Sequence, residues 1–443
     1  MLSPLLLCVA AAFTGGAVWL AICAVASIVS AIVIGFRFRA ATASFRNVDS
    51  NEPICLSDAN LPHYTVIAPL YRESEVVGKL VKALAALDYP AAKIEVKLVI
   101  EDGDMQTRAA IEALELPQRF ETVVAPAGGP QTKPRALNVA LARARGSLIV
   151  VFDAEDSPEP GQLRLAAEHF AAANARLACL QARLAIDNTG DGWLTALFGI
   201  EYAALFDVLN PGLAAIGAPM LLGGTSNHFR TSALRRVCGW DAWNVTEDAD
   251  LGLRLARFGY TVETIASTTH EEAPARLGPW LLQRRRWVKG WIQTLIVHGR
   301  TPARLLRELG LSGAIAAFSL LLSGIAGPLL APVFVIALAH DAIWGDLFAP
   351  ANLLDAIWSM VWAGLAVAGL GSILLMAALG ARRRHLRTEA RYLVALPVYY
   401  ALITIAAWGA LWDFWRRPFA WSKTEHGLAK TSRRRGIVES AGL

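Results

Sequence analysis

Cysteine is scarce and scattered in this sequence. The 443 residues contain only five cysteines, and none of them form a CxxC pattern. An odd number of isolated cysteines does not form a complete disulfide framework, and without paired spacings it does not indicate a zinc site. We therefore expect neither a disulfide-stabilised secreted domain nor a structural zinc protein.

Charged residues are also few. They make up 18% of the chain, whereas hydrophobic residues make up 55%, and the mean hydropathy is +0.40. Four stretches contain no Asp, Glu, Lys or Arg, namely 1–36, 309–339, 356–381 and 392–412. Each of them is at least as long as the roughly 20 residues that a helix needs to cross a hydrocarbon core. The composition excludes an ordinary soluble enzyme and predicts an integral membrane protein.

The segment between the apolar stretches has the composition of a soluble domain. The net charge of +5 comes from basic clusters next to the apolar stretches, such as Arg382 to Arg384. This is the positive-inside pattern, so we expect the domain in the cytoplasm at the inner membrane and no nucleic-acid partner. The predicted parts are a transmembrane anchor at 1–36, a cytoplasmic linker at 37–62, a globular domain at 63–275, an amphipathic interfacial helix at 276–300, a transmembrane region at 301–415 and a basic tail at 416–443.

Two of the apolar stretches leave alternatives open. Segment 1–36 is either one tilted anchor or a hairpin broken at Gly15-Gly16. If segment 392–412 spans the membrane, the basic tail lies outside, against the positive-inside rule. Pro397 and the aromatic-rich end of that segment allow a re-entrant or interfacial element instead.

The globular segment alternates short apolar runs with helical periodicity. The apolar runs predict strands at 65–71, 96–100, 148–152, 221–230 and 260–265. The helical patterns lie at 73–87, 134–144, 158–174, 191–210 and 245–258. Strands that alternate with helices imply an α/β fold with a mostly parallel sheet and flanking helices.

Three acids follow the central apolar run. Asp153, Glu155 and Asp156 come directly after 148–152. This position is the carboxyl edge of the sheet, where open α/β sheets bind ligands. Close carboxylates repel one another unless a cation lies among them, and their hard oxygens suit Mg²⁺ or Mn²⁺. The alternative interpretation is a solvated acidic turn.

Further polar motifs lie at other element ends. Glu101 and Asp102 follow the strand at 96–100, and Thr246 is a plausible N-cap in front of Glu247 and Asp248. The helix at 276–298 mixes basic and aromatic residues and contains the sequence QRRRW at 283–287. Such a helix tends to lie in the membrane interface with its arginines toward the headgroups.

The motifs ED at 101–102, DAED at 153–156, TED at 246–248 and QRRRW at 283–287 occur in this order. With them the sequence resembles the membrane-embedded family 2 glycosyltransferases, which include cellulose, hyaluronan and chitin synthases. The matching residues run from about Thr65 to Trp291, and the membrane segments are placed as in those synthases. The resemblance implies a GT-A-type fold and a nucleotide-sugar donor, most simply a UDP-sugar.

The resemblance also implies where the donor binds. The implied donor-binding residues are Pro69, Tyr71, Glu73, Glu101, Asp102, Lys133, Asp153 and Arg286. Asp153 and Glu155 occupy the family's DxD positions, where the carboxylates hold Mg²⁺ or Mn²⁺ against the diphosphate. Because Glu155 departs from the usual Asp, Asp156 shares this role in our interpretation.

An inverting sugar transfer needs a carboxylate that takes the proton of the acceptor hydroxyl. We predict Asp248 as this base, which contributes roughly 10²–10⁴-fold, kept ionised by the positive end of the helix dipole, with Glu247 orienting it. By resemblance Trp287 stacks on the acceptor sugar. The predicted acceptor-binding residues are Gly223, Gly224, Thr225, Gln283 and Trp287, with Asn227 and His228 as weaker candidates. Met220 and the aromatic residues of 191–210 are expected in the core.

The leading functional hypothesis is a processive transferase that extends a β-linked polysaccharide and guides it across the membrane, with accessory export subunits as possible partners. The first alternative is a single sugar addition to a polyprenyl-phosphate or other lipid acceptor. The second is a catalytically silent scaffold or export subunit. Intact positions for base, cation and acceptor disfavour the silent homologue.

Overall fold

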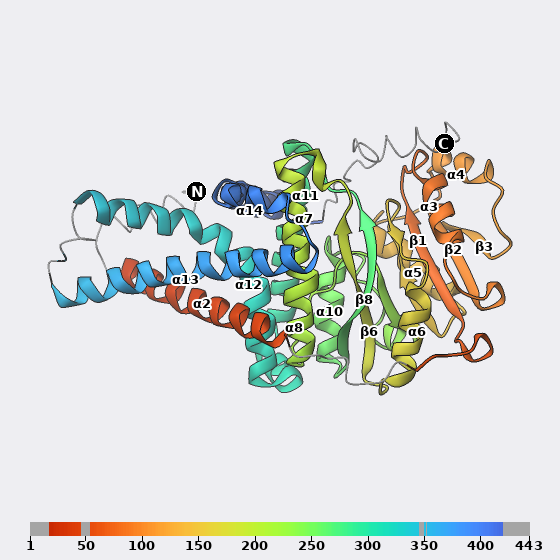
Figure 1. Ribbon diagram of the computed structural model, residues 1–443, viewed down its shortest axis with the longest axis horizontal. Coiled ribbons are helices and arrows are strands. Elements are labelled where there is room, and N and C mark those ends of the chain that lie inside the picture. Colours follow the sequence, from red (N-terminus) through yellow and green to blue (C-terminus); the bar gives the residue numbers. More distant parts are fainter. Residues whose placement is uncertain (1–16, 46–53, 345–349, 351, 420–443) are drawn as a thin grey trace.

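The computed structural model describes residues 17–45, 54–344, 350 and 352–419. The hairpin considered at Gly15-Gly16 and nearly all of the basic tail therefore lie outside the described residues. Two parts are visible in Figure 1, a sheet domain and a bundle of long helices beside it. The helices α7 (Trp193–Ala203), α8 (Asn210–Ala215) and α11 (Leu277–Gly299) lie where these parts meet.

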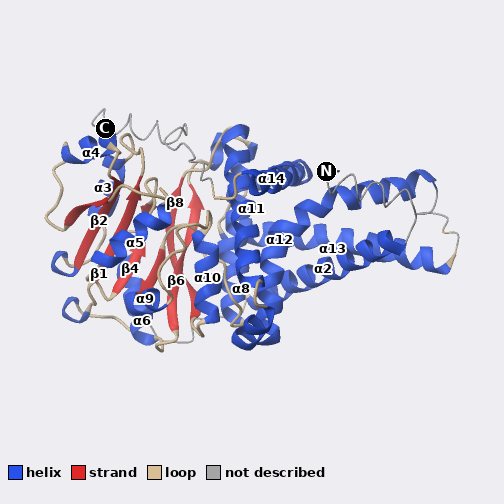
Figure 2. Ribbon diagram, turned by 180° about the vertical axis from the view of Figure 1, so that it is seen from behind, coloured by secondary structure: helices blue, strands red, loops and turns tan. Residues whose placement is uncertain are grey.

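The domain is built on one eight-stranded sheet. Its strand order is β3-β2-β1-β4-β7-β6-β8-β5, and four of the seven pairings are parallel. Figure 2 shows the sheet with helices on both sides. The strands are β1 (Tyr64–Leu70), β2 (Ile94–Glu101), β3 (Phe120–Ala125), β4 (Leu148–Val151), β5 (Ser157–Pro158), β6 (Leu177–Ile186), β7 (Asn227–Arg230) and β8 (Thr261–Glu271). The predicted α/β fold is confirmed.

The helices fall into two sets. Those of the domain are α3 (Val77–Ala85), α4 (Met105–Glu112), α5 (Lys133–Arg143), α6 (Gln162–Ala172), α7 (Trp193–Ala203), the π-helical turn η4 (Ala204–Leu209), α8 (Asn210–Ala215), α9 (Thr231–Arg236), α10 (Glu247–Arg257) and α11 (Leu277–Gly299). The long apolar set is α2 (Ala17–Ala43), α12 (Pro302–Trp344), α13 (Leu353–Arg383) and α14 (Leu396–Arg416). Short 3₁₀ turns are η1 (Asp58–Asn60), η2 (Ala91–Lys93), η3 (Thr189–Asp191) and η5 (Glu389–Ala395).

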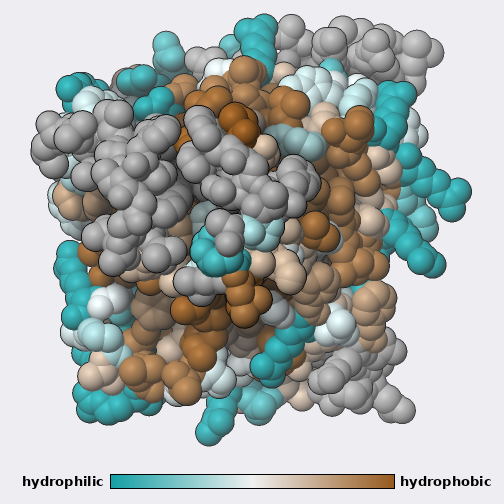
Figure 3. Space-filling model, turned by 90° about the vertical axis from the view of Figure 1, so that its left-hand side faces the viewer, coloured by the Kyte–Doolittle hydropathy of each residue, from teal (hydrophilic) through white to brown (hydrophobic). Residues whose placement is uncertain are grey.

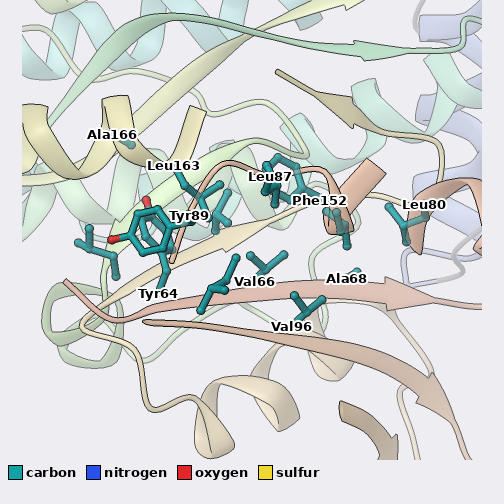
Figure 4. Close-up of a cluster of buried hydrophobic side chains, with 14 of the residues drawn as sticks. Tyr64, Val66, Ala68, Leu80, Leu87, Tyr89, Val96, Phe152, Leu163 and Ala166 are labelled. Carbon is teal, nitrogen blue, oxygen red and sulfur yellow. The ribbon is translucent and has the colours of Figure 1, made fainter. Parts of the chain in front are cut away.

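Both faces of the central strands are buried. Successive side chains of a strand point to opposite faces, and Val66 and Ile67 are each 0% exposed. Val66 belongs to a core cluster with Leu80 and Leu163 from α3 and α6, which Figure 4 shows as one packed group. Ile67 belongs to a second cluster with residues of α5, α9 and α10. Near-continuous apolar runs are the expected composition of parallel strands covered on both faces.

The predicted strand at 221–230 is the main error in the domain. Only Asn227–Arg230 forms a strand, β7, and it pairs antiparallel with β4 and β6. The preceding loop turns at Ser226, whose φ of 56° lies in the left-handed region. The strands β3 and β6 were not predicted from the sequence. The strand β8 continues six residues beyond its predicted end at residue 265.

Four helices within the described residues are long and apolar enough to cross a membrane, at Cys23–Ala43, Pro302–Ile336, Asp355–Arg383 and Glu389–Arg416. In Figure 1, α2 and α13 run side by side away from the sheet domain. Figure 3, viewed from the side of these helices, shows hydrophobic side chains across this face and hydrophilic ones around its rim. The predicted linker begins later than expected, because α2 continues to Ala43.

The helix α14 lies against the helix α11 of the sheet domain. Tyr399 near its start contacts Arg284, and Asp413 near its end accepts a hydrogen bond from Arg285. In Figure 1, α14 is seen nearly end-on, whereas α2 and α13 lie in the plane of the picture. By length and composition α14 can also cross a membrane, so both alternatives for segment 392–412 stay predictions.

The basic end of α13 anchors the bundle to the domain. Arg383 donates hydrogen bonds to the carbonyl of Asp207 and to Ser44. Arg384 donates to the carboxylate of Asp207, which is 5% exposed, and to the carbonyl of Leu184. These arginines were predicted only as a membrane-flanking loop. In the structure they fix the π-helical turn η4 against the long apolar helices.

The first prediction concerns the contact between α13 and η4. An added Cβ at Gly380 would lie 2.5 Å from the backbone nitrogen of Ala204. Because forced overpacking typically costs about 1–3 kcal/mol, we expect Gly380→Ala to lower the thermal unfolding midpoint of the purified protein in detergent. The matched control is Gly371→Ala in the same helix, where a Cβ meets nothing within 4 Å. Equal midpoints for the two variants would contradict the close packing.

Candidate active site

A pocket of about 270 Å³ lies at the carboxyl ends of β1, β2 and β4. Its remaining walls come from α7, η4, the loop before β7, the first turn of α10 and the helix α11. The site residues predicted above line it, except Asp102, Asp156 and the weaker candidates Asn227 and His228. The predicted residues that line the pocket are Pro69, Tyr71, Glu73, Glu101, Lys133, Asp153, Glu155, Gly223, Gly224, Thr225, Glu247, Asp248, Gln283, Arg286 and Trp287.

The two acids that follow β2 separate. Glu101 is 6% exposed, lines the pocket and pairs with Arg135 at 3.2 Å. Burial raises the pKa of Glu101, and the guanidinium of Arg135 opposes this rise. Asp102 is exposed and does not line the pocket. Of the two acids that follow β2, only Glu101 lines the pocket.

Lys133 and Asp153 form the charged floor of the pocket. The Nζ of Lys133 lies 2.5 Å from Oδ1 of Asp153 and donates a hydrogen bond of 2.8 Å to the carbonyl of Gly224. Although burial would lower the pKa of Lys133, the carboxylates of Asp153 and Glu247 raise it, so the ammonium stays charged. An added Cβ at Gly224 would lie 3.4 Å from Oδ2 of Asp248 and 3.8 Å from Oδ2 of Asp153. The missing side chain of Gly224 keeps open the space between these two acids.

Asp156 does not join the predicted cation site. It is 1% exposed, and its Oδ2 accepts hydrogen bonds from the backbone N–H of Asp153, at 2.7 Å, and from the hydroxyl of Thr225. Within the described part of the chain, no group of three or more His, Cys, Asp or Glu side chains is placed to hold a metal ion. The three acids therefore do not converge, because Asp156 points inward and supports the loop that carries Asp153.

The acids at the start of α10 have raised pKa values. Burial raises the pKa of Glu247 to about 7, and the charge of Asp248 adds to this against the opposing effect of Lys133. Burial also raises the pKa of Asp248, although Lys133 and Arg286 oppose the rise. Burial thus outweighs the helix-dipole effect expected for Asp248. The hydroxyl of Thr246 forms no cap hydrogen bond in the structure.

The three arginines of QRRRW point to different partners. Arg284 is buried and pairs with Glu201, whereas Arg285 pairs with Asp413 of α14. Arg286 lines the pocket. The expectation that Arg284 and Arg285 face lipid headgroups is thus wrong, because each has an acidic partner on a neighbouring helix.

Gln283 and Trp287 lie one helical turn apart on the wall formed by α11. Gln283 is 9% exposed, and its Oε1 is buried without a hydrogen-bond partner among the described residues. A buried carbonyl oxygen without a partner costs free energy unless a ligand supplies a donor. Trp287 lies against Phe198, with ring centroids 5.9 Å apart. This part of the wall offers one acceptor atom and one aromatic ring to a bound molecule.

Several residues that line the pocket were not predicted for the site. Burial raises the pKa of Glu271 to about 8, with further contributions from Glu155 and Asp153, and it hydrogen-bonds with Tyr202. Phe198, Tyr202 and Phe206 were expected in the core, yet they also line the pocket. The sequence signal for Glu271 was the acid pair Glu271-Glu272 at the end of a strand, as at Glu101. We did not recognise this signal because we predicted that the strand ends at residue 265.

The residues rated as weaker acceptor candidates belong to the core. His228 is 0% exposed and contacts the hydroxyl of Tyr64, and burial lowers its pKa to about 3. Asn227 is buried and donates a hydrogen bond to the carbonyl of Gly223. Met220 is fully buried, as expected.

Comparison with known proteins gives one family. Residues 148–411 match the model of the glycosyl transferase family group 2. The beta-monoglucosyldiacylglycerol synthase of Synechocystis sp. is 30% identical over 56% of this chain and 52% of its own length. A probable glucomannan 4-beta-mannosyltransferase of Arabidopsis thaliana is 24% identical over 58% of this chain and 46% of its own length. The chain thus spans about half the length of the curated relatives it matches.

A solved structure supports the fold. The mannosyltransferase PcManGT from Pyrobaculum calidifontis, solved in complex with GDP-Man and Mn²⁺, aligns with a TM-score of 0.54. The alignment covers 78% of this chain and 99% of that protein, at 20% sequence identity. At this identity the likeness concerns the GT-A-type fold of the domain.

The second prediction concerns Glu271. Its pKa of about 8 lies above the ordinary value of 4.5, so the folded protein binds this proton more tightly than the unfolded chain. Stability should therefore fall as pH rises through this window. Glu271→Gln removes the charge, and we expect its thermal midpoint to exceed that of the wild type at pH 8.5, with a gap that narrows toward pH 4.5. The exposed Glu112→Gln serves as control. A gap that does not change with pH would contradict the assignment.

Proposed function

The chain belongs to the glycosyl transferase family group 2, and we propose that it is an inverting hexosyltransferase that moves a sugar from a nucleotide-sugar to an acceptor hydroxyl. One observation carries this proposal. The carboxylates of Asp248 and Asp153 face each other across Gly224, with the Nζ of Lys133 beside them. A base, a cation-binding carboxylate and a phosphate-binding ammonium thus share one small space.

The donor lies over the sheet edge in this proposal. Glu101, Tyr71 and Pro69 line the side of the pocket toward the nucleoside. Lys133 and Arg286 also line the pocket. In this proposal they contact the diphosphate, because their positive charges attract phosphate oxygens. We propose a UDP-sugar as the donor.

The site fits a divalent cation. Asp153 and Glu155 both line the pocket and offer hard carboxylate oxygens, which suit Mg²⁺ or Mn²⁺. The Nζ of Lys133 lies 2.5 Å from Oδ1 of Asp153, so an ion bound here would share this carboxylate with the ammonium. These two residues would hold the ion, and the ion would neutralise charge on the leaving diphosphate.

The chemistry that this chain supplies is proton transfer and charge stabilisation. Asp248 accepts the proton of the acceptor hydroxyl while that oxygen forms a bond to the anomeric carbon of the donor sugar. The bond between this carbon and the phosphate oxygen breaks, and the nucleoside diphosphate leaves with the electron pair. Lys133 and Arg286 stabilise the negative charge that develops on it. Attack opposite to the leaving group inverts the anomeric configuration.

The proposed acceptor is the end of a growing β-linked polysaccharide. The face of Trp287 suits the C–H face of a sugar, and the buried Oε1 of Gln283 accepts a hydrogen bond from a sugar hydroxyl. If the product stays bound to Trp287 and Gln283 after each transfer, the enzyme is processive. Export of the polymer, alone or with accessory subunits, completes this proposal.

A second acceptor class has its own support. Among the described residues, those that line the pocket come from the sheet domain and α11, and none come from α2, α12, α13 or α14. The pocket therefore does not lead into the bundle of spanning helices. The Synechocystis relative described above is named a beta-monoglucosyldiacylglycerol synthase. Both features favour a single sugar addition to a membrane lipid.

We also propose an orientation. The basic end of α13 is bonded to the sheet domain through Asp207, so this end and the domain lie on the same side of the membrane. The positive-inside rule places that side in the cytoplasm at the inner membrane. Nucleotide-sugar donors then reach the pocket from the cytoplasm.

The third prediction tests the reaction. Membranes that contain the protein are incubated with a panel of radiolabelled nucleotide-sugars and Mg²⁺, beside membranes with Asp248→Asn. We expect transfer from one donor in the wild type and a loss of about 10²–10⁴-fold in the variant, because the neutral amide does not accept the proton. Binding of the nucleoside diphosphate should persist in the variant. Full activity of Asp248→Asn would contradict the assigned role.

The product decides between the acceptors. Chains of many sugars indicate the polysaccharide, whereas a lipid with one added sugar indicates the second candidate. Loss of transfer after removal of divalent ions by EDTA, and recovery with Mg²⁺ or Mn²⁺, would support the cation proposal. No transfer from any donor, to any acceptor and with partner proteins supplied, would favour a silent homologue.

A further inference from the structure

Arg284 lies in a cage of aromatic rings behind the pocket. Its guanidinium carbon is 4.6 Å from the ring centroid of Trp287, 4.6 Å from that of Phe198 and 5.0 Å from that of Trp280. The ring of Tyr399 completes the cage at 5.7 Å. The side chain is only 4% exposed. Because Trp287 also lines the pocket, its ring has the guanidinium on one side and the pocket on another.

Hydrogen bonds fix the guanidinium in this place. Both terminal nitrogens of Arg284 donate to the carboxylate of Glu201, each at 2.6 Å. One of them also donates to the hydroxyl of Tyr399 at 2.9 Å, and this hydroxyl donates to Glu201 at 2.6 Å. Tyr399 belongs to α14, and Glu201 lines the pocket from α7. The arginine therefore connects three helices, α7, α11 and α14, at the wall of the pocket.

A buried ion pair is weak support for stability, because desolvation of two charges offsets much of their attraction. Its geometry, however, is specific. The planar fork of arginine matches a carboxylate in two parallel bonds and stacks on aromatic rings, which an ammonium does not. Cation–π contacts are stronger when the charged group is desolvated, as the 4% exposed side chain of Arg284 is here. The arrangement is thus suited to hold one ring orientation of Trp287.

We propose that Arg284 is a positioning residue, which fixes the ring of Trp287 for the acceptor, and that Tyr399 of α14 holds Arg284 in its place. The acceptor wall then depends on a helix of the membrane region that does not itself line the pocket. This inference rests on the proposed function, because it assumes that Trp287 contacts the acceptor. It holds for a glycan and for a lipid-linked acceptor alike.

The test compares three variants with the wild type in the transfer assay. Arg284→Lys keeps the charge but loses the paired bonds and the stacking, and Tyr399→Phe keeps the ring but loses the hydroxyl. We expect the acceptor KM to rise about tenfold in Arg284→Lys and less in Tyr399→Phe. The donor KM should stay within about twofold, because Lys133 and Asp153 are untouched. Arg285→Lys is the matched control, since Arg285 pairs with Asp413 outside the pocket.

A second readout does not depend on activity. The protein is labelled with 5-fluorotryptophan, and Trp287→Phe identifies the ¹⁹F signal of Trp287. We expect this signal to shift or broaden in Arg284→Lys and to stay unchanged in Arg285→Lys. An unchanged Trp287 signal together with a wild-type acceptor KM would overturn the proposal. A shifted signal in a protein without any transferase activity would instead contradict the proposed function and leave the positioning of Trp287 supported.

Discussion

The site depends on how carboxylates are kept together in one pocket. Asp153, Glu155, Glu247, Asp248 and Glu271 all line it, and burial raises the pKa values of Glu247, Asp248 and Glu271. Lys133 opposes this, because its ammonium pairs with Asp153 and lowers the pKa of both Glu247 and Asp248. Arg286 acts on Asp248 in the same direction. Burial still outweighs these two cations, so the pKa of Asp248 stays above its ordinary value and that of Glu247 is raised to about 7. In the proposed reaction, the charges of the donor diphosphate and its cation would also act on the pKa values of Glu247 and Asp248.

Arginines connect this pocket to the membrane region. Arg384 binds Asp207 in the π-helical turn η4, and Arg284 binds Glu201 and Tyr399 beside Trp287. Short π-helical turns are frequently found at functional sites, and here the turn supplies Leu205 and Phe206 to the pocket wall. The long apolar helices thus help to shape the pocket through side chains that they hold in place. If the proposed activity holds, this arrangement gives a physical reason why the pocket and the apolar helices share one chain.

Much of the fold and most of the site could be predicted from the sequence. Acids after apolar runs located Glu101, Asp153 and Glu155, because parallel strands bring their carboxyl ends to one edge. The direction of each side chain could not be predicted from the sequence. For this reason Asp102, which is exposed, and Asp156, which points inward, were wrongly expected in the pocket. The partners of Arg284 and Arg285 could not be predicted either, because Glu201 and Asp413 are distant in sequence. Glu271 was missed because its strand has mixed polar and apolar residues up to the pocket.

The most direct test of the account is the anomeric configuration of the product. A base at Asp248 on the far side of the sugar from the diphosphate permits one displacement and hence inversion. The linkage formed from the accepted α-linked nucleotide-sugar is measured by ¹H and ¹³C NMR of the purified product. The account predicts a β-linkage. An α-linked product would require a second displacement or attack from the same face, and would contradict the role of Asp248 as the single catalytic base.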